Sequence, residues 1–480
     1  MVASFPCAQQ RREPPTRPHR GDEVTLRPTF VHPRSDEWAA PGGPWDQPPL
    51  DELLGPHEGV AALTGGLHGM GVGRGDVVAW QRPNGPEVIS LYRACWRLGA
   101  VAAPIHHLAG DAEVARLLAR LDPNVFFAAG DELPEGPPAA ATGQASDVAC
   151  VLWTAGSSGQ PKGVLHTQRA LAYKARTMVE VHGLTADDVV LMPAPLAHIS
   201  GLLNAVLVAE VAGMRAVLMA KWDPEHALDL IAAEGVTYMV GPPTFFIGLM
   251  AAPGFSPERV ASLRLISSGG AGVTPAFIDE ATERLGAVVK RAYGSTEAPT
   301  VSTTHQGDPP ERARDTDGRP TGVVEVRLGD DDELLVSGPE LFVGYDDPDA
   351  TAAAVTDGWF HTGDRAAIDA DGWITITGRL KDVIIRGGEN VSVSAVEATL
   401  EAHPSVRHAV VVGEPDERLG ERVVAVVEAD GSFDLESCQQ WFAEQGATKF
   451  TWPERVVRVD AIPTLPAGKP DRDAVRRLIA

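Results

Sequence analysis

The chain has 480 residues, of which 44% are hydrophobic and 22% charged. That composition is typical of a globular protein with a large core and two or more domains. The formal net charge of −24 disfavours binding to nucleic acid or to anionic membranes, because no run of Lys or Arg follows the first 35 residues to override it. Four scattered cysteines with no CxxC pair argue against a disulfide framework or a zinc site, so we expect a cytoplasmic protein.

Residues 1–35 predict a disordered tail. Their apolar stretch is too short for a signal sequence, and arginines and prolines follow it at once. Further along, the most apolar region begins at Leu202 and is broken by Glu210 and Arg215, so it falls short of a membrane span. We therefore expect no membrane insertion.

Short apolar runs alternate with helical patterns between about residues 148 and 298. This is the rhythm of a mainly parallel sheet with helices on both faces. Asp223 and Thr274 each precede a proline and are expected to cap helices. Ligands of such sheets bind beyond the carboxyl ends of the strands, so the loops at 154–163 and 294–297 are placed for binding.

The last third of the chain changes character. Short strands and glycine turns between about 320 and 380 predict a β-rich subdomain. Beyond it, strands and helices alternate, with Ser394 and Glu397 expected to open one helix as a capping box. The predicted fold is a large α/β N-terminal domain over residues 36–380, with mainly parallel sheets, flanking helices and the β-rich subdomain. A small, mobile α+β C-terminal domain over residues 381–480 follows it.

The loop TAGSSGQPKG, residues 154–163, has the ingredients of a polyphosphate site. It is not a P-loop, because Gly156 to Lys162 reads GxxGxxK and no Ser or Thr follows the lysine. Its glycines expose backbone N–H groups, its hydroxyls donate hydrogen bonds, and its lysine adds positive charge. Taken alone, the stretch fits a flexible surface turn equally well.

The rest of the chain removes that ambiguity. This loop, AYGSTE, TGD, GRLKD, GGEN and PAGK occur in one order at set distances. Together they resemble the signature of the adenylate-forming superfamily of acyl-CoA synthetases, adenylation domains and firefly-type luciferases, from about residue 50 to the C-terminus. That family joins a carboxylate to the α-phosphate of ATP, releases pyrophosphate, and passes the acyl group from AMP to a thiol. The resemblance implies ATP, Mg²⁺ and coenzyme A, an ATP- and acyl-binding N-terminal domain, and a C-terminal lid that carries a catalytic lysine.

The resemblance also implies roles for single residues in the nucleotide site. Tyr293 offers a flat face for adenine, Thr296 a hydroxyl for the α-phosphate, and Glu297 an oxygen ligand for Mg²⁺. Asp364 and Arg379 are expected at the ribose. The whole set expected to bind ATP or AMP is Thr154, Ser157, Ser158, Gly159, Lys162, Gly269, Gly270, Ala271, Tyr293, Gly294, Ser295, Thr296, Asp364 and Arg379.

Lys469, in LPAGKPDR, stands where the family has its catalytic lysine. Two anions must meet in the reaction, and one ammonium inserted from a mobile loop offsets their repulsion. Thr296 and His198 complete the expected catalytic set. Pro470, directly after the lysine, departs from the family pattern.

The resemblance places the hinge of the C-terminal domain at Lys381 and the coenzyme A channel at Gly387 and Gly388. Residues 391–396 lack the proline and the first glutamate often seen after this motif. The details of the second step are therefore less well predicted than its class.

The segment PAPLAHISGLLNA borders the acyl pocket in this family. It carries Ala197 and His198 where an amino-acid-activating domain has an aspartate, so we expect an apolar or alicyclic carboxylic acid, as in ligases for short or medium fatty acids and cyclohexanecarboxylate. A buried structural role for His198 stays open, and Asn204 could meet a polar substituent or bond to backbone. The expected pocket residues are Ala197, His198, Gly201, Asn204 and Phe245.

The predicted function is that of an ATP-dependent carboxylate–CoA ligase, an acyl-CoA synthetase. Two alternatives stay open. One is an acyl-AMP ligase that loads the phosphopantetheine of a carrier protein, although no carrier domain follows Ala480. The other is a catalytically inactive protein that binds nucleotide or an acyl ligand.

Overall fold

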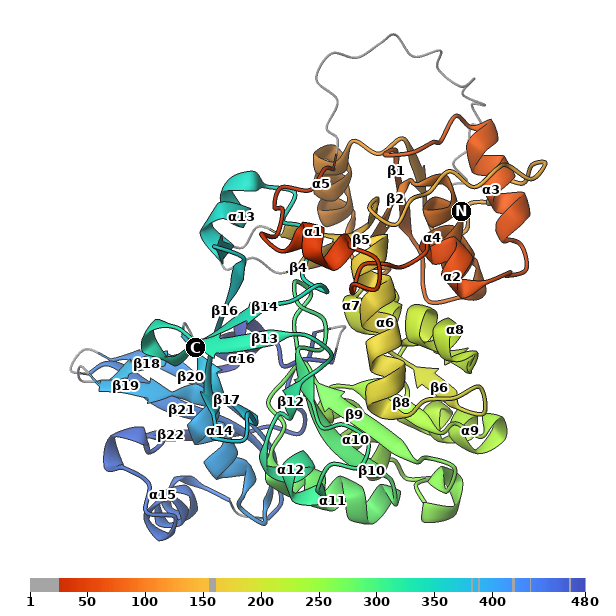
Figure 1. The fold of residues 1–480 in the computed structure, drawn as a ribbon. Helices are drawn as coiled ribbons and strands as arrows, with labels where there is room; N and C mark the ends of the chain where they lie inside the picture. Colours follow the sequence, from red (N-terminus) through yellow and green to blue (C-terminus); the bar gives the residue numbers. More distant parts are fainter. Residues whose placement is uncertain are drawn as a thin grey trace, which may run out of the picture.

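The structure is a computed structural model that describes residues 26–154, 161–380, 383–386, 389–416, 419–431, 433–465 and 468–479. Its strands form four sheets (Figure 1). Two of them are largely parallel and lie in the first two thirds of the chain, the third is antiparallel, and the fourth belongs to the C-terminal segment.

The first sheet has the order β3-β1-β2-β4-β5. Strands β1 to β4 run parallel, and β5 pairs antiparallel with β4. Its strands are β1 (Val77–Gln81), β2 (Val101–Ile105), β3 (Val125–Phe127), β4 (Val148–Thr154) and β5 (Lys162–Thr167). Its neighbouring helices are α1 (Ser35–Ala39), α2 (Leu50–Leu54), α3 (Val60–Gly69), α4 (Pro86–Leu98) and α5 (Asp111–Leu121).

The second sheet has the order β12-β11-β10-β9-β8-β6-β7, with a parallel core from β6 to β10. Its strands are β6 (Val189–Met192), β7 (Arg215–Leu218), β8 (Tyr238–Gly241), β9 (Leu265–Gly269), β10 (Val288–Tyr293), β11 (Ser302–Thr303) and β12 (Arg319–Pro320). Its helices are α7 (Ile199–Gly201), a π-helical turn (Leu202–Val208), α8 (Ala209–Ala212), α9 (Pro224–Glu234), α10 (Pro243–Ala251), α11 (Pro275–Leu285) and α12 (Pro310–Asp315).

Local sequence explains where two of these helices begin. The side chain of Asp223 accepts a hydrogen bond from the backbone of His226 at 3.0 Å, and Thr274 accepts one from Phe277 at 3.3 Å. Each cap precedes a proline at the first helical position, where the missing N–H costs nothing. Both predicted caps are confirmed.

Helix α6 (Gln168–His182) lies between the two parallel sheets (Figure 1), and the π-helical turn contacts α6, β6 and β7. One hydrophobic core joins strands of both sheets through them, and it includes Trp80, Leu152, Leu171, Leu203 and Tyr238. The predicted arrangement of mainly parallel sheets with helices on their faces is therefore confirmed.

The third sheet is the predicted β-rich region. Its strands are antiparallel, and β16 is long enough to pair with β14, β15 and β17. Its elements are β13 (Glu325–Leu328), β14 (Glu333–Ser337), α13 (Pro348–Ala354), β15 (Val355–Thr356), β16 (Trp359–Ile368) and β17 (Ile374–Arg379).

The fourth sheet, in blue beside β17 in Figure 1, has the order β19-β18-β21-β20, with β22 against β21. Three helices pack with it, so the small α+β unit has its own core. Its elements are β18 (Val383–Arg386), β19 (Glu389–Ser392), α14 (Val393–Glu401), β20 (Val406–Asp416), β21 (Gly420–Ala429), α15 (Leu435–Glu444), β22 (Arg455–Arg458) and α16 (Arg472–Ile479).

Two predictions are wrong in detail. Helix α14 is capped by Ser392, whose hydroxyl accepts from Ala395 N–H at 3.4 Å, and not by Ser394. Residues 26–35 are not a disordered tail, because the N–H groups of Thr29 and Phe30 both donate to Val343 O, at 2.9 and 3.0 Å. Among the helices of the described ranges, none combines the length and the apolar character that crossing a membrane requires.

A fully buried ion pair joins Lys174 of α6 to Glu340, which lies in the segment between β14 and α13. Lys174 Nζ lies 3.5 Å from the carboxylate of Glu340, and neither side chain is exposed. The same ammonium donates to Thr321 Oγ1 at 2.8 Å and to Thr300 O at 3.1 Å. Burial lowers the pKa of Lys174 and raises the pKa of Glu340, so each charge depends on the other.

We predict that Lys174→Met lowers the free energy of unfolding by about 3 kcal/mol, because it leaves a buried carboxylate without its partner. Urea denaturation followed by circular dichroism measures the change. Lys174→Met combined with Glu340→Leu should recover part of the loss, because an apolar pair replaces the ion pair. Equal midpoints for wild type and Lys174→Met would show that the pair contributes nothing to stability.

Candidate active site

The predicted nucleotide residues gather at the carboxyl ends of β9 and β10. The loops leave these strands at Gly269 and Tyr293. Packing requires glycine both at position 269 and at position 294, directly after Tyr293. A Cβ on Gly269 would lie 2.1 Å from Ala292 O, and one on Gly294 would lie 2.4 Å from Thr300 N. A larger residue at 269 would push β9 away from β10, and one at 294 would open the turn between Gly294 and Thr300.

Tyr293, Asp364 and Arg379 form one connected group. The Tyr293 hydroxyl donates to Asp364 Oδ2 at 2.7 Å, and Arg379 Nε lies 2.9 Å from Asp364 Oδ1. Asp364 and Arg379 are also cross-strand neighbours on β16 and β17. Burial, and then the Asp364 carboxylate, raise the pKa of Tyr293 well above its ordinary value, so it stays a neutral phenol. Each carboxylate oxygen keeps a second lone pair with which it can accept from a ribose hydroxyl.

Glu297 and Lys162 meet through a residue that sequence reasoning missed. The Tyr345 hydroxyl donates to Glu297 Oε1 at 2.7 Å, and Lys162 Nζ lies 4.5 Å from the centroid of the same ring. Thr154 and Lys162, at the two ends of the phosphate loop, are cross-strand partners. Tyr345 stands in no glycine-rich or hydroxyl-rich pattern, so only its tertiary contacts reveal it.

A buried histidine, His166, binds the backbone of Thr296. His166 Nε2 lies 2.7 Å from Thr296 O and donates to it. Burial lowers the pKa of His166 to about 4, so the ring is neutral. The Ser295 hydroxyl takes part in the turn that follows β10, because it accepts a hydrogen bond from Ala298 N–H at 3.2 Å. His166 was also missed, since a lone histidine in an apolar strand gives no local signal.

Lys469 lies in a hairpin that docks on the N-terminus of α10. Leu465 N–H donates to Lys469 O at 2.7 Å, and Thr464 and Pro470 form an antiparallel bridge. Pro470, the departure from the family pattern, therefore helps to close the hairpin. The hydroxyl of Thr244 donates to Gly468 O at 2.6 Å, which fastens the hairpin to α10.

Gly468 allows that docking. Its φ is +79°, and a Cβ there would lie 2.7 Å from Phe245 Cε1 and 2.8 Å from Pro242 Cγ. The lysine that follows lies against Gly270, where an added Cβ would lie 3.2 Å from Lys469 Cε. A side chain at either glycine would therefore displace the lysine.

The charges around Lys469 are mixed. Desolvation, and then the positive charge of Arg379, lower its pKa, while Asp364 and Glu297 oppose that shift. The side chain still has solvent access. Lys469 thus lies within electrostatic reach of both carboxylates expected at the nucleotide.

The expected acyl side centres on His198. Its ring lies 5.4 Å from that of His106, measured between centroids. Burial, then His106 and Lys469, lower the pKa of His198 to about 4, so it is neutral at physiological pH. Phe245 stacks on Trp222 at 4.7 Å between centroids.

Two further residues predicted for the acyl pocket, Gly201 and Asn204, have structural roles in this fold. A Cβ on Gly201 would lie 2.2 Å from Pro195 O, so glycine is required where the chain enters the π-helical turn. Asn204 donates to Ser200 O at 2.9 Å and accepts from the Tyr238 hydroxyl at 3.2 Å. These bonds favour the structural alternative for Asn204 over contact with a substrate.

The described residues thus bring together Lys162, Tyr293, Glu297, Asp364, Arg379 and Lys469 around one region. Six predicted residues lie outside the described ranges: Ser157, Ser158 and Gly159 of the phosphate loop, Lys381 at the expected hinge, and Gly387 and Gly388 of the expected channel.

These residues fit a Mg²⁺ ion that arrives with ATP. Within the described ranges, no three or more His, Cys, Asp or Glu side chains cluster closely enough to hold a metal. Mg²⁺ at phosphate sites commonly uses one or two carboxylates together with substrate phosphates and water. Glu297 has one oxygen held by Tyr345 and can offer the other.

Comparison with known proteins decides the family. The AMP-binding enzyme family matches residues 57–139 and 128–346, and the AMP-binding enzyme C-terminal domain matches residues 395–469. The chain belongs to the AMP-binding enzyme family. The predicted adenylate-forming resemblance is confirmed, and so is the division into a large N-terminal α/β domain and a small C-terminal one.

Two curated relatives are CoA ligases. This AMP-binding enzyme is 31% identical to the medium-chain fatty-acid–CoA ligase of Escherichia coli (strain K12), over 87% of this chain and 84% of that protein. It is 34% identical to a feruloyl-CoA synthase of Amycolatopsis sp, over 87% and 92%. Among solved structures, ATP-bound MatB from Rhodopseudomonas palustris superposes with a TM-score of 0.80 at 28% identity, covering 89% of this chain and 92% of that one.

The neutral state of His198 gives a prediction that does not depend on activity. Because its pKa is lowered to about 4, its imidazole signals should not titrate between about pH 5.5 and 8. NMR of the ¹³C-histidine-labelled enzyme, with the signal assigned by comparison with His198→Gln, measures this. His408 is an internal contrast, because the Glu401 carboxylate raises its pKa although burial opposes the shift. A His198 midpoint near 6.5 would contradict the burial described above.

Proposed function

We propose that this enzyme is an ATP-dependent carboxylate–CoA ligase. It forms an acyl adenylate with release of pyrophosphate and then transfers the acyl group to coenzyme A, which gives a thioester and AMP. The observation that carries the proposal is the position of Lys469, which a C-terminal hairpin brings against Gly270 and within electrostatic reach of Glu297 and Asp364.

In the first half-reaction, the residues of this chain bind and orient ATP. Tyr293 packs against adenine, Asp364 and Arg379 hold the ribose, and Thr154 and Lys162 with the loop between them hold the outer phosphates. Gly269, Gly270 and Ala271 leave room for the nucleotide. Glu297 holds Mg²⁺, which neutralises phosphate charge when bound.

The chemistry then needs one oxygen of the substrate carboxylate to attack the α-phosphorus. The bond between the α-phosphorus and the bridging oxygen breaks, and pyrophosphate leaves with the electron pair. Thr296 donates to an α-phosphate oxygen. Lys469 stabilises the negative charge that develops between carboxylate and phosphate, and it acts from a partly desolvated position where such an interaction is strong.

The substrate is a carboxylic acid without an α-amino group. The charged or basic groups that act on His198 are Lys469 and His106. A substrate ammonium at this position would therefore lie near the positive charge of Lys469. Trp222, which is half-buried and stacks on the buried ring of Phe245, offers apolar surface that suits a linear, alicyclic or aromatic body, in line with the fatty-acid and feruloyl relatives.

Coenzyme A is the proposed acceptor, and it enters past Gly387 and Gly388 after the C-terminal domain turns about Lys381. Both co-substrates belong to the cytoplasm, so we place the reaction there. The test is to incubate the enzyme with ATP, Mg²⁺, coenzyme A and a panel of linear, alicyclic and aromatic acids, with α-amino acids as controls, and to detect thioesters by mass. Thioesters are expected from several of these acids and from no α-amino acid. Acyl transfer to a carrier protein alone, with coenzyme A inert, would contradict the proposed acceptor.

Lys469→Ala should slow adenylate formation by about 100-fold or more, because a transition-state contact is lost. ATP–pyrophosphate exchange measures this half-reaction. Thiol transfer from supplied acyl adenylate should change little in the same variant. Lys449→Ala is the matched control, a C-terminal lysine that lies in a separate 3₁₀ turn. Equal loss of both half-reactions would remove Lys469 from its assigned role.

Gly388→Leu should have the opposite effect, because a bulky side chain would block the thiol channel that the family pattern places there. ATP–pyrophosphate exchange should stay near the wild-type rate while thioester formation falls. A thermal melt checks that the variant is folded. Normal overall turnover would place the channel elsewhere.

A further inference from the structure

The direction of Lys469 depends on how the following helix is anchored. Its hairpin leads directly into α16, which begins at Arg472, and Asp471 N–H donates back to Pro463 O at 2.8 Å. Apolar residues Val475 and Ile479 bury α16 against the fourth sheet. That apolar contact is non-directional, so a polar contact is needed to fix where the hairpin starts and ends.

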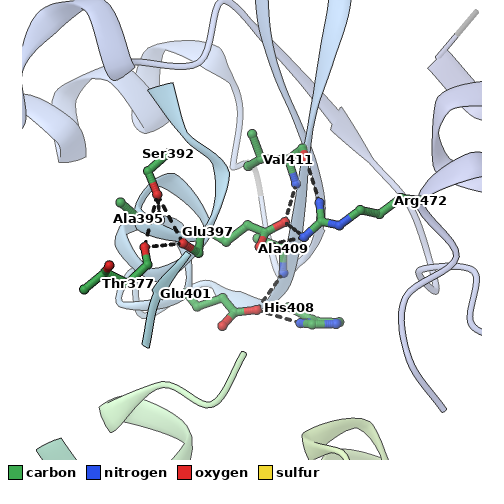
Figure 2. Close-up of polar contacts among 10 residues, drawn as sticks. Thr377, Ser392, Ala395, Glu397, Glu401, His408, Ala409, Val411 and Arg472 are labelled. Carbon is green, nitrogen blue, oxygen red and sulfur yellow. Dashed lines mark hydrogen bonds and ion pairs between the residues drawn. The ribbon is translucent and has the colours of Figure 1, made fainter. Parts of the chain in front are cut away.

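Glu397 of α14 supplies such a contact (Figure 2). Arg472 Nη2 lies 2.8 Å from Glu397 Oε1 and 3.0 Å from Oε2. Val411 N–H donates to Glu397 Oε1 at 2.8 Å, and Arg472 Nη1 donates to Val411 O, also at 2.8 Å. The carboxylate, the guanidinium and the backbone N–H and C=O of Val411 thus form a closed ring that joins α14, β20 and the start of α16.

The position of β20 explains why this ring forms. Strand β20 is at the edge of its sheet, so one side of its backbone has no strand partner among the described residues. The ring satisfies both the N–H and the C=O of Val411 on that side. Burial raises the pKa of Glu397 to about 7, and nearby Glu401 adds to the shift, whereas Arg472 opposes it. The charge of Glu397 therefore depends on its guanidinium partner.

Glu401 provides a natural comparison one helical turn further along α14 (Figure 2). Its Oε1 accepts from Ala409 N–H at 3.1 Å and from His408 Nδ1 at 2.6 Å. Both glutamates thus bind the edge of β20 from the same helix. In the contacts drawn, Arg472 is bound by Glu397 and not by Glu401. Comparing Glu397 with Glu401 therefore distinguishes two roles: both residues bind the edge of β20, but of the two only Glu397 is drawn in contact with Arg472, which follows the lysine hairpin.

We propose that Glu397 is a positioning residue for Lys469, because its carboxylate fixes Arg472 and with it the hairpin that presents the lysine to the adenylation site. This inference rests on the proposed function for the role of Lys469. It assigns a task in the first half-reaction and none in the second, since thiol transfer does not use the lysine.

The test compares Glu397→Gln with Glu401→Gln. An amide offers one acceptor oxygen where the carboxylate offers two, so Glu397→Gln loses the paired contact with Arg472. We expect ATP–pyrophosphate exchange to fall about tenfold in Glu397→Gln and less than about twofold in Glu401→Gln. Thiol transfer from supplied acyl adenylate should be unchanged in both. Equal rates for the two variants, or equal loss of both half-reactions in Glu397→Gln, would overturn the proposal.

A second readout needs no substrate. Hydrogen–deuterium exchange over residues 463–471 should accelerate in Glu397→Gln and stay at the wild-type rate in Glu401→Gln. Arg472→Lys should behave as Glu397→Gln does, because a lysine cannot make the paired contact, and it serves if Glu397→Gln does not fold. Unchanged hairpin exchange would overturn the inference even in an active enzyme. A wild type that lacks ATP–pyrophosphate exchange would instead contradict the proposed function, while hairpin exchange still tests the role of Glu397.

Discussion

The docking of one hairpin on the N-terminus of α10 decides whether the other groups of the site can act together. Two carboxylate side chains, Glu297 and Asp364, lie at the site, and the substrates are a carboxylate and a polyphosphate. Lys469 therefore adds to the positive charge that Lys162 and Arg379 bring to the same region. The lysine reaches the site because the Thr244 hydroxyl donates a hydrogen bond to Gly468 O, and because Gly468 has no side chain that would clash with α10. Charge balance thus depends on a contact between residues more than two hundred positions apart in the sequence.

Three buried side chains fix the positions of site residues through hydrogen bonds. His166 donates to Thr296 O, Tyr345 donates to Glu297, and Lys174 reaches Thr300 O. Each contact satisfies a polar group that would otherwise be buried without a partner. These side chains keep the segment from 294 to 300 in place, so that the Thr296 hydroxyl proposed for phosphate and the Glu297 carboxylate proposed for Mg²⁺ are positioned in advance.

Much of the fold could be predicted from the sequence, because local signals suffice for it. Alternating apolar runs and helical patterns gave the parallel sheets, and Asp223 and Thr274 gave helix starts. Errors arose where two local signals competed. Ser392 and Ser394 both suit a cap, and only the course of β19 decides between them. Residues 26–35 look unstructured on their own, yet they pair with Val343 far along the chain.

The site was predictable only as far as its motifs reach. Tyr293, Asp364, Arg379 and Lys469 stand in motifs, whereas Tyr345, Thr244 and His166 come from segments with no pattern of their own. Their roles depend on tertiary contacts that no spacing encodes. Asn204 shows the converse, since a polar residue in an apolar helix could suggest a ligand contact but is bonded to Ser200 and Tyr238.

The most direct test of this account is ATP–pyrophosphate exchange by the wild-type enzyme without coenzyme A, across linear, alicyclic and aromatic carboxylic acids. Acid-dependent exchange would establish that the assembled residues form an acyl adenylate, which is the central claim. ATP binding without exchange for any of these acids would contradict it, and would favour a protein that binds nucleotide without turning it over.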